Sequence, residues 1–187
     1  DYNKAILQDD KDVEAYFDRG NAWAYRGDYD KSIADYNEAI KLDSQYVDAY
    51  INRGNAMCRK GKWDRAFDDY TEAIRLRPGN AVAYFNRANV RRVRGEYDKA
   101  IDDYTEVIRL IPNEARTYCR RGVIWKLKGD SDKAITNYTE AIRLDPNHVD
   151  AYLNRAVAWY SKGEFRNAYA DHMEAGRIET RRGATVK

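Results

Sequence analysis

The stretch AVAYFNRANVRRVRGEYDKAIDDYTEVIRLIPNE, which occupies residues 81–114, decides the fold because the chain repeats its pattern every 34 residues. An alanine–tyrosine pair, a glycine and a second tyrosine mark each copy, and Thr117-Tyr118 replaces the pair once. A fixed period of this length is the signature of a repeat protein. The recurring residues are Ala15-Tyr16, Ala49-Tyr50, Ala83-Tyr84 and Ala151-Tyr152; Gly27, Gly61, Gly95, Gly129 and Gly163; and Tyr2, Tyr36, Tyr70, Tyr104 and Tyr138.

The period divides the chain into five repeats with flanking residues at both ends. The repeats are 13–46, 47–80, 81–114, 115–148 and 149–182. Residues 1–12 match the second half of a repeat, and residues 183–187 are left as a tail. The start inside a repeat indicates a piece of a longer array, and residues 1–182 are predicted to form a single array.

Each repeat has the pattern of two helices. In the second half of 81–114, Ala100, Tyr104 and Val107 lie three or four positions apart, which places them on one face of a helix. The repeating glycine suits the left-handed turn between the helices, and a proline ends the second helix of the three middle repeats. The sequence therefore predicts an all-α chain of helical hairpins.

This pattern resembles the tetratricopeptide repeat family over residues 13 to about 178. The resemblance implies a solenoid of antiparallel helix pairs that forms a right-handed superhelix, with first helices lining a concave groove. The last repeat departs from the pattern at His172, Gly176 and Thr180, so it is expected to cap the array or to fray at its last turn. Arginine also replaces the usual leucine of the first helix in every copy, at Arg19, Arg53, Arg87, Arg121 and Arg155.

Composition narrows the function classes. The chain carries 33 Lys and Arg against 31 Asp and Glu, a net charge of +2, which removes the bulk electrostatic argument for nucleic acid. No apolar run approaches the roughly 18 residues of a membrane helix, and residues 1–4 are not the start of a signal peptide. Because the chain starts inside a repeat, a cytoplasmic location is only a default, weakly supported by two cysteines with no evident partner.

The residues that carry most catalytic and metal chemistry are scarce. Cys58 and Cys119 cannot form a zinc site or a disulfide scaffold unaided, and His148 and His172 are the only histidines. The sequence also has no glycine-rich phosphate loop and no Ser-His-Asp set. We therefore expect no enzymatic activity, no metal and no cofactor.

Many conspicuous residues have a structural explanation. Ten of the sixteen tyrosines, and three of the four tryptophans, occupy repeating slots that are expected to pack in the core. The repeated arginine is accompanied by an aspartate beside the repeating tyrosine of the second helix. We expect buried or half-buried ion pairs between packed helices, such as Arg53 with Asp35 or Asp69; the alternative is that the arginines face a ligand. The aspartates are Asp1, Asp35, Asp69, Asp103 and Asp171.

Charge differs between the two helices of each repeat, the first being basic on balance and the second acidic. With the family's geometry, a basic groove would concentrate field and favour an acidic partner. The alternative is a solvated helix face. The basic residues concentrate in the third and fourth repeats at Arg91, Arg92, Arg94, Arg116, Arg120, Lys126 and Lys128.

Asparagine recurs in two slots that face the groove in the family. Because an amide both donates and accepts, a row of amides can hold an extended peptide backbone without reading its side chains. The alternative is that these amides bond neighbouring repeats to one another. One slot holds Asn52, Asn86 and Asn154, and the other holds Asn21, Asn55 and Asn89.

A sharper hypothesis is the carboxylate clamp by which some co-chaperones of this family hold a C-terminal aspartate. The residues Asn55, Asn86, Arg116 and Arg120 match four of its five slots, and Ile51 replaces the lysine of the fifth. Arginine can hold a carboxylate through two hydrogen bonds. The clamp's lysine slot is apolar along the chain, which suggests anchors for apolar side chains of a peptide, at Phe17, Ile51, Phe85 and Leu153.

The sequence thus predicts a protein–protein interaction module that binds an extended, acidic peptide or partner segment, without nucleic acid or membrane. Two alternatives remain: a scaffold that self-associates through its exposed array ends, and the recruiting arm of a larger enzyme or complex. The predicted binding residues are Phe17, Asn21, Asn52, Asn55, Phe85, Asn86, Asn89, Arg92, Arg116, Arg120, Lys126 and Asn154.

Overall fold

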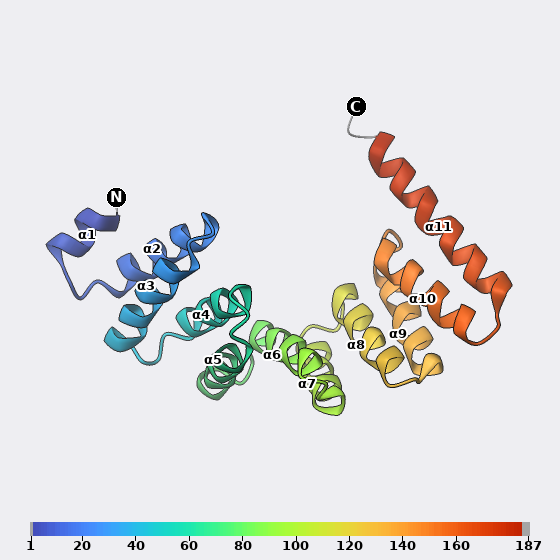
Figure 1. Cartoon of the computed structure of the whole chain (residues 1–187), viewed down its shortest axis with the longest axis horizontal. Helices are drawn as coiled ribbons and strands as arrows, with labels where there is room; N and C mark the ends of the chain where they lie inside the picture. Colours follow the sequence, from blue (N-terminus) through green and yellow to red (C-terminus); the bar gives the residue numbers. More distant parts are fainter. Residues whose placement is uncertain (1, 185–187) are drawn as a thin grey trace. The chain divides into compact units, whose positions relative to one another are not determined.

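The computed structural model describes residues 2–184, and every regular element in that range is an α-helix (Figure 1). This confirms the all-α prediction. Asp1 and the tail residues 185–187 lie outside the described residues, whereas residues 183 and 184 belong to the last helix. The helices are α1 Tyr2–Gln8, α2 Val13–Tyr25, α3 Tyr29–Leu42, α4 Val47–Arg59, α5 Trp63–Leu76, α6 Ala81–Val93, α7 Tyr97–Leu110, α8 Ala115–Leu127, α9 Ser131–Leu144, α10 Val149–Ser161 and α11 Phe165–Ala184.

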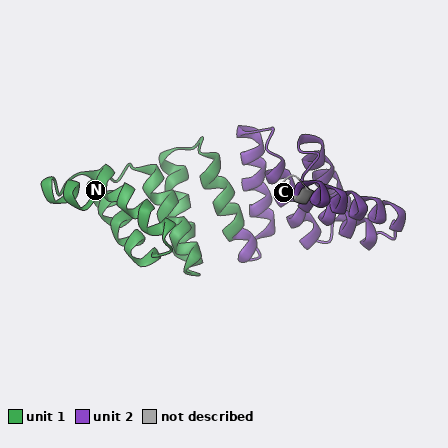
Figure 2. Cartoon of the chain, turned by 90° about the horizontal axis from the view of Figure 1, so that it is seen from above, with its two compact units in different colours: residues 1–90 green, residues 91–187 purple. Residues whose placement is uncertain are grey.

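The chain divides into two compact units, residues 1–90 and 91–187, with the boundary inside α6 (Figure 2). In unit 1, α2 packs on α3, α4 packs on α5, and α3 and α4 join the two hairpins. In unit 2, α8 packs on α9 and α10 on α11, with contacts from α7 to α8 and from α9 to α10. Each unit therefore consists of stacked helical hairpins, and a single continuous array remains a prediction.

The turns inside the hairpins follow from the repeating glycine. All five of these glycines have a positive φ, between 70° and 82°, whereas no other residue type within residues 2–184 does. This conformation is strained for residues with a Cβ atom, so glycine marks the point where a first helix ends. Asp12 and Asn80 cap first helices by accepting a hydrogen bond from the backbone N–H groups of Ala15 and Ala83, at 2.9 and 3.0 Å.

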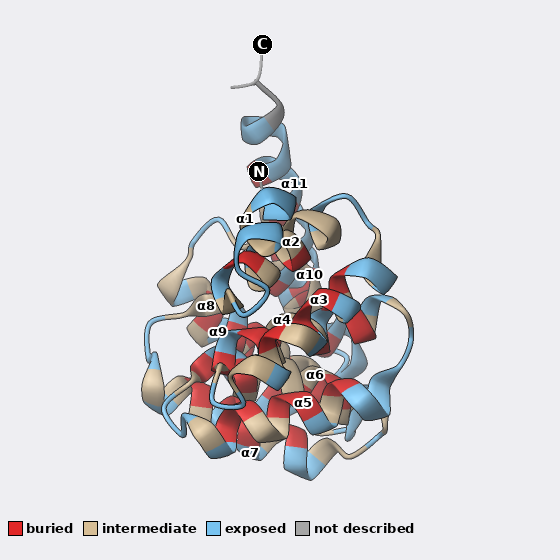
Figure 3. Cartoon of the chain, turned by 90° about the vertical axis from the view of Figure 1, so that its left-hand side faces the viewer, coloured by how far each residue is buried: buried red, intermediate tan, exposed pale blue. Residues whose placement is uncertain are grey.

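The core of each of the first four repeats is built around the second tyrosine, whose slot holds His172 in the fifth. Tyr36, Tyr70, Tyr104 and Tyr138 are at most 1% exposed. A small residue on the first helix makes room for the ring: a Cβ atom added at Gly54 would lie 2.7 Å from the ring of Tyr70. Buried and exposed residues alternate along the helices, as expected for helices with one buried face (Figure 3).

The predicted ion pairs are present in the first, second and fifth repeats, where each joins the two helices of the repeat. Arg53 donates from Nη2 and Nε to the two carboxylate oxygens of Asp69, at 2.6 and 3.0 Å, so its partner is Asp69 rather than Asp35. Its Nη1 atom reaches the previous repeat and donates to Asn37 at 2.7 Å. The guanidinium also lies 5.4 Å from the centre of the Tyr50 ring. Arg53 therefore links three elements: its own helix, its partner helix and the preceding repeat. Arg19 and Arg155 make the same set of contacts.

The last repeat ends differently from the others. Its second helix, α11, runs for 20 residues to Ala184, whereas α9 has 14. Thr180 stands where the middle repeats have proline, and its hydroxyl donates to the backbone oxygen of Gly176 at 2.8 Å. Without proline nothing stops the helix, so the expected fraying does not occur in the described residues.

Candidate peptide-binding surface

The asparagines of unit 1 form two hydrogen-bonded pairs between neighbouring first helices. Asn21 Oδ1 accepts from the Tyr36 hydroxyl at 2.7 Å and from Asn52 Nδ2 at 2.8 Å. In the next repeat, Asn55 Oδ1 accepts from the Tyr70 hydroxyl at 2.8 Å. The same oxygen accepts from Asn86 Nδ2 at 2.9 Å. The alternative raised for the asparagines is therefore correct for these four residues: they bond one repeat to the next.

These bonds leave one amide nitrogen and one amide oxygen of each pair unused. Asn21 Nδ2 and Asn52 Oδ1 take part in no hydrogen bond to the described residues. The same holds for Nδ2 and Oδ1 of the equivalent residues in the second pair, Asn55 and Asn86 respectively. Burial raises the pKa of Tyr70, which keeps the hydroxyl protonated as a donor. Each pair is thus held in one orientation and still offers one amide NH2 group as donor and one carbonyl oxygen as acceptor.

The remaining asparagines behave differently. Asn89 Nδ2 donates to the backbone oxygen of Phe85 at 2.9 Å, one turn earlier in α6. In unit 2, Asn154 Nδ2 lies 4.0 Å from the sulfur of Cys119, a weak contact. Val123 occupies the partner slot in the fourth repeat, so no amide pair of the unit 1 type can form there. Among the described residues, the amide pairs with this geometry therefore lie in unit 1.

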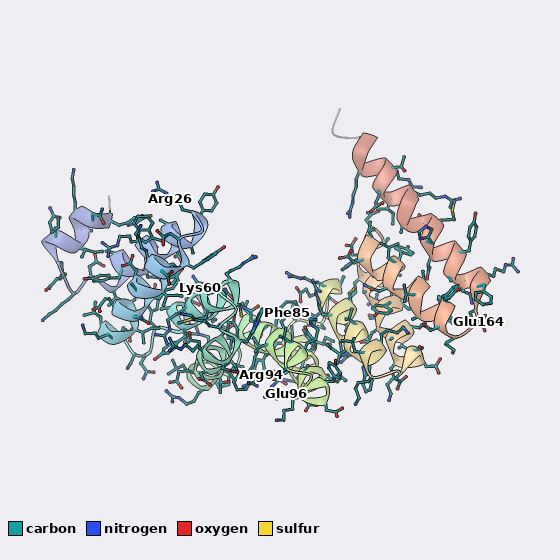
Figure 4. All side chains as sticks on the ribbon, viewed as in Figure 1. Arg26, Lys60, Phe85, Arg94, Glu96 and Glu164 are labelled. Atoms are coloured by element: carbon teal, nitrogen blue, oxygen red, sulfur yellow. The ribbon has the colours of Figure 1, made fainter. Side chains whose placement is uncertain are left out.

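The apolar anchors are partly engaged within the protein. Ile51 is 5% exposed and belongs to the core with Ala83, so it offers no surface to a ligand. The half-buried ring of Phe17 lies 4.8 Å from the ring of Tyr46, measured between centroids. Phe85 is half-buried on α6 (Figure 4). Only part of each phenylalanine ring could therefore meet a peptide.

Ion pairs reduce the basic excess expected from the sequence. Arg91 pairs with the buried carboxylate of Asp103 at 2.8 Å. Arg94 and Glu96 lie together after α6, 3.8 Å apart (Figure 4). Lys128 pairs with Asp98. The sequence count missed these pairs because their carboxylates lie in or next to the second helix, which packs against the first.

Arg92, Arg116 and Arg120 form what we call the basic cluster of unit 2. Burial raises the pKa of Tyr104 to about 12, and all three guanidinium groups oppose that rise, so each lies within electrostatic range of its hydroxyl. Arg120 makes no ion pair with any described residue. Lys126, the fourth predicted cation, donates instead to Ser161 at 2.8 Å.

Part of the basic cluster lines a pocket of about 280 Å³ between α8 and α10. Three predicted residues, Arg116, Arg120 and Asn154, meet there. Two carboxylates share the lining, so the pocket can receive both signs of charge. Asn55 and Asn86 lie in unit 1, and the clamp that would join them to the arginines remains a prediction. The lining is Ala115, Arg116, Cys119, Arg120, Val123, Asp145, His148, Asp150 and Asn154.

Sequence reasoning missed an apolar pocket of about 480 Å³ in the last repeat. Phe165 and Tyr169 are 61% and 67% exposed there. In the second repeat, Val90 of the following helix packs on the equivalent face, in one cluster with Ala66 and Tyr70, which correspond to Ala168 and His172. The sequence did contain a sign of this pocket, because both aromatic residues follow α10, the first helix of the fifth repeat. The lining is Leu153, Ala156, Val157, Tyr160, Phe165, Ala168, Tyr169 and His172.

Residues 2–184 contain no group of three or more His, Cys, Asp or Glu side chains placed to hold a metal ion. Within the same range, none of the helices has the length and apolar character of a membrane span.

Comparison with known proteins identifies the fold. A search of curated proteins by sequence gave no match. A crystal structure of MamA is 25% identical, with a TM-score of 0.83 over 88% of this chain and 96% of that chain. MamA residues 41 to the end from Desulfovibrio magneticus RS-1 are 18% identical, with a TM-score of 0.84 over 90% and 95%. YrrB, described as a TPR protein with an unusual peptide-binding site, is 23% identical, with a TM-score of 0.79 over 96% and 92%.

Family models match most of the chain. A TPR repeat model matches residues 20–61, 54–92 and 124–163, and a tetratricopeptide repeat model matches residues 81–114. Together with the stacked hairpins, the turn glycines and the buried tyrosines, these matches show that the chain belongs to the tetratricopeptide repeat family.

Proposed function

We propose that this protein is a binding module that holds an extended segment of a partner protein along its first helices and has no catalytic step of its own. The proposal is based on two pairs of hydrogen-bonded asparagines, Asn21 with Asn52 and Asn55 with Asn86, whose amides are held in a fixed orientation. Each pair offers the donor and acceptor that a peptide group in an extended chain requires.

In this mechanism the asparagines bind backbone rather than side chains. A peptide carbonyl would accept from Asn21 Nδ2, and a peptide N–H would donate to Asn52 Oδ1. Each such hydrogen bond contributes about 0.5–1.5 kcal/mol, so one pair alone binds weakly and consecutive pairs are needed. Because the amides are already held by the tyrosine hydroxyls, little side-chain entropy is lost on binding.

The basic cluster supplies the preference for an acidic segment. Arginine holds carboxylates through charge-assisted hydrogen bonds, and the pocket at Arg116 and Arg120 has room for one side chain or a chain end. The peptide-binding site of YrrB adds precedent for the fold. At 23% identity that likeness extends only to architecture, so the proposal rests on the side chains of this chain.

Replacing Asn52 and Asn86 together with alanine should weaken binding of an acidic peptide by about tenfold, because two backbone hydrogen bonds are lost. Fluorescence anisotropy of labelled peptides measures the affinity. A matched control removes two exposed amides from the turns between repeats, Asn113→Ala with Asn147→Ala, and should leave the affinity unchanged. Equal affinities for both double variants and the original chain would show that the asparagines do not bind peptide.

The same assay tests the terminal-carboxylate hypothesis if each peptide is made with a free and with an amidated C-terminus. Loss of binding on amidation would assign Arg116 and Arg120 to a chain end. Equal binding of both forms would assign them to an internal acidic side chain and would exclude the clamp. Absence of binding by either form would count against an acidic peptide as the ligand.

A second candidate function, self-association as a scaffold, is favoured by the apolar pocket of α10 and α11. The equivalent face of the second repeat is covered by a helix, so the exposed face would accept a helix from a second copy. Sedimentation equilibrium should then show dimers that Phe165→Glu with Tyr169→Lys converts to monomers. Both side chains are exposed, so the variant should stay folded. A monomer at high concentration in the unchanged chain would contradict this function.

A further inference from the structure

The repeated arginine loses its counter-ion in one repeat. In the first, second and fifth repeats the Nη2 atom donates to an aspartate carboxylate at 2.6 or 2.7 Å. The Nε atom donates to the second oxygen of the same carboxylate. In the fourth repeat the equivalent position of the second helix is Asn137. Arg121 therefore has the surroundings of its sister residues without the negative charge.

The amide of Asn137 cannot replace the carboxylate fully. Its Nδ2 group donates to the backbone oxygen of Lys133 at 2.8 Å, which directs Oδ1 towards Arg121. That oxygen accepts from Arg121 Nε at 2.8 Å, and Arg121 Nη1 donates to the Thr105 hydroxyl at 3.0 Å. No described residue accepts a hydrogen bond from Nη2, the atom that makes the shortest bond in the sister repeats.

The surroundings raise the cost of this missing acceptor. Burial lowers the pKa of Arg121, in contrast to Arg19, whose pKa is raised by its hydrogen bond to Asp35. A guanidinium that is partly removed from water and lacks a counter-ion is destabilising, because its lost hydration is not replaced by an anion.

A cavity of about 430 Å³ lies beside this guanidinium, between α8 and α9. Thr139 contributes a hydroxyl that accepts from Arg155 at 2.9 Å and donates to no described residue, so its proton is available. Glu140 is the one acid in the lining, and Arg143 compensates its charge at 2.7 Å. The lining is Tyr118, Arg121, Ile135, Thr136, Asn137, Thr139 and Glu140, and it shares no residue with the pocket between α8 and α10.

We propose that Arg121 and this cavity form a binding site for one carboxylate group, which restores the charge that an aspartate supplies in the sister repeats. Arg121 Nη2 and the Thr139 hydroxyl would donate to it. The carboxylate can belong to a small organic acid or to an acidic side chain of a partner, since both present the same group. The site is separate from the proposed peptide surface and does not depend on it.

The chain provides its own matched variant for the test. Asn137→Asp introduces the aspartate of the sister repeats, so it should fold normally and occupy Arg121 from within the chain. Acetate is the probe for a small acid, and a peptide with one internal glutamate and blocked ends is the probe for a partner's side chain. The NMR signal of the Arg121 Nε–H group reports binding of either probe, with sodium chloride at equal ionic strength as the reference.

The unchanged protein should show a saturable shift of this signal with at least one probe, and Asn137→Asp should weaken that binding by at least about tenfold. Saturation by acetate would identify a small acid, and saturation by the peptide alone would identify a partner's side chain. Asn137→Asp should also raise the melting temperature. The proposal is overturned if neither probe saturates the signal, or if the variant binds them as well as the unchanged protein.

Discussion

Replacing Asp69 with alanine is expected to lower the free energy of unfolding by about 3–5 kcal/mol, because it leaves a half-buried guanidinium without its counter-ion. The side chains of Arg53 and Asp69 are 19% and 8% exposed, so water replaces the lost carboxylate poorly. Burial raises the pKa of Asp69, and the hydrogen bond from Arg53 opposes that rise. The pair therefore contributes modest net stability, whereas removal of one partner costs much more.

Urea unfolding followed by circular dichroism measures this difference. Glu38→Ala removes the same charge from an exposed pair with Lys41 and should change stability by at most about 1 kcal/mol. The loss of stability caused by Asp69→Asn should fall between these two values. In the fourth repeat an asparagine already takes this place, where Asn137 Oδ1 accepts from Arg121 Nε at 2.8 Å. If Asp69→Ala costs no more than Glu38→Ala, the arginine is held by its other contacts and the ion pair has no structural role.

The repeat pattern made the fold predictable, because each marker residue has one local physical task. Glycine is needed where φ is positive, and a small residue is needed where the tyrosine ring meets the first helix, as at Gly54. The ion pair of Arg53 was predictable for the same reason, since two unusual charges recur together. Choosing Asp69 over Asp35 required the packing of the two helices.

The binding surface was less predictable, because it depends on which neighbours each polar group meets. A recurring asparagine predicts hydrogen-bond donors and acceptors on the first helix. Which atoms of Asn55 remain available depends on the Tyr70 hydroxyl of the second helix, which donates to Asn55 Oδ1. Adding the charges of the first helices overestimated the basic surface, since Arg91 forms an ion pair with Asp103 of the second helix. The missing counter-ion of Arg121 was visible in the sequence as Asn137 in an aspartate slot, although its open cavity was not.

Reversing the two charges of the basic cluster that line the pocket should have the largest effect on binding. Arg116→Glu with Arg120→Glu is expected to weaken the affinity for an acidic peptide by about 100-fold or more. Two charge-assisted hydrogen bonds at about 1.5 kcal/mol each already account for that factor. The new carboxylates also repel the acidic peptide, and they do so together with Asp145 and Asp150, which line the same pocket. Anisotropy at low and at high salt measures the effect, which should shrink as salt screens the charges.

The control must change net charge equally without touching this pocket. Arg75→Glu with Arg177→Glu does so on second helices, where both arginines are more than 60% exposed and pair with Glu72 and Glu174. Its affinity should stay within about twofold of the original. Arg116→Gln with Arg120→Gln removes charge without adding repulsion, and a loss of about tenfold would show that attraction itself contributes. If both reversals weaken binding equally, overall charge rather than the basic cluster selects the acidic partner.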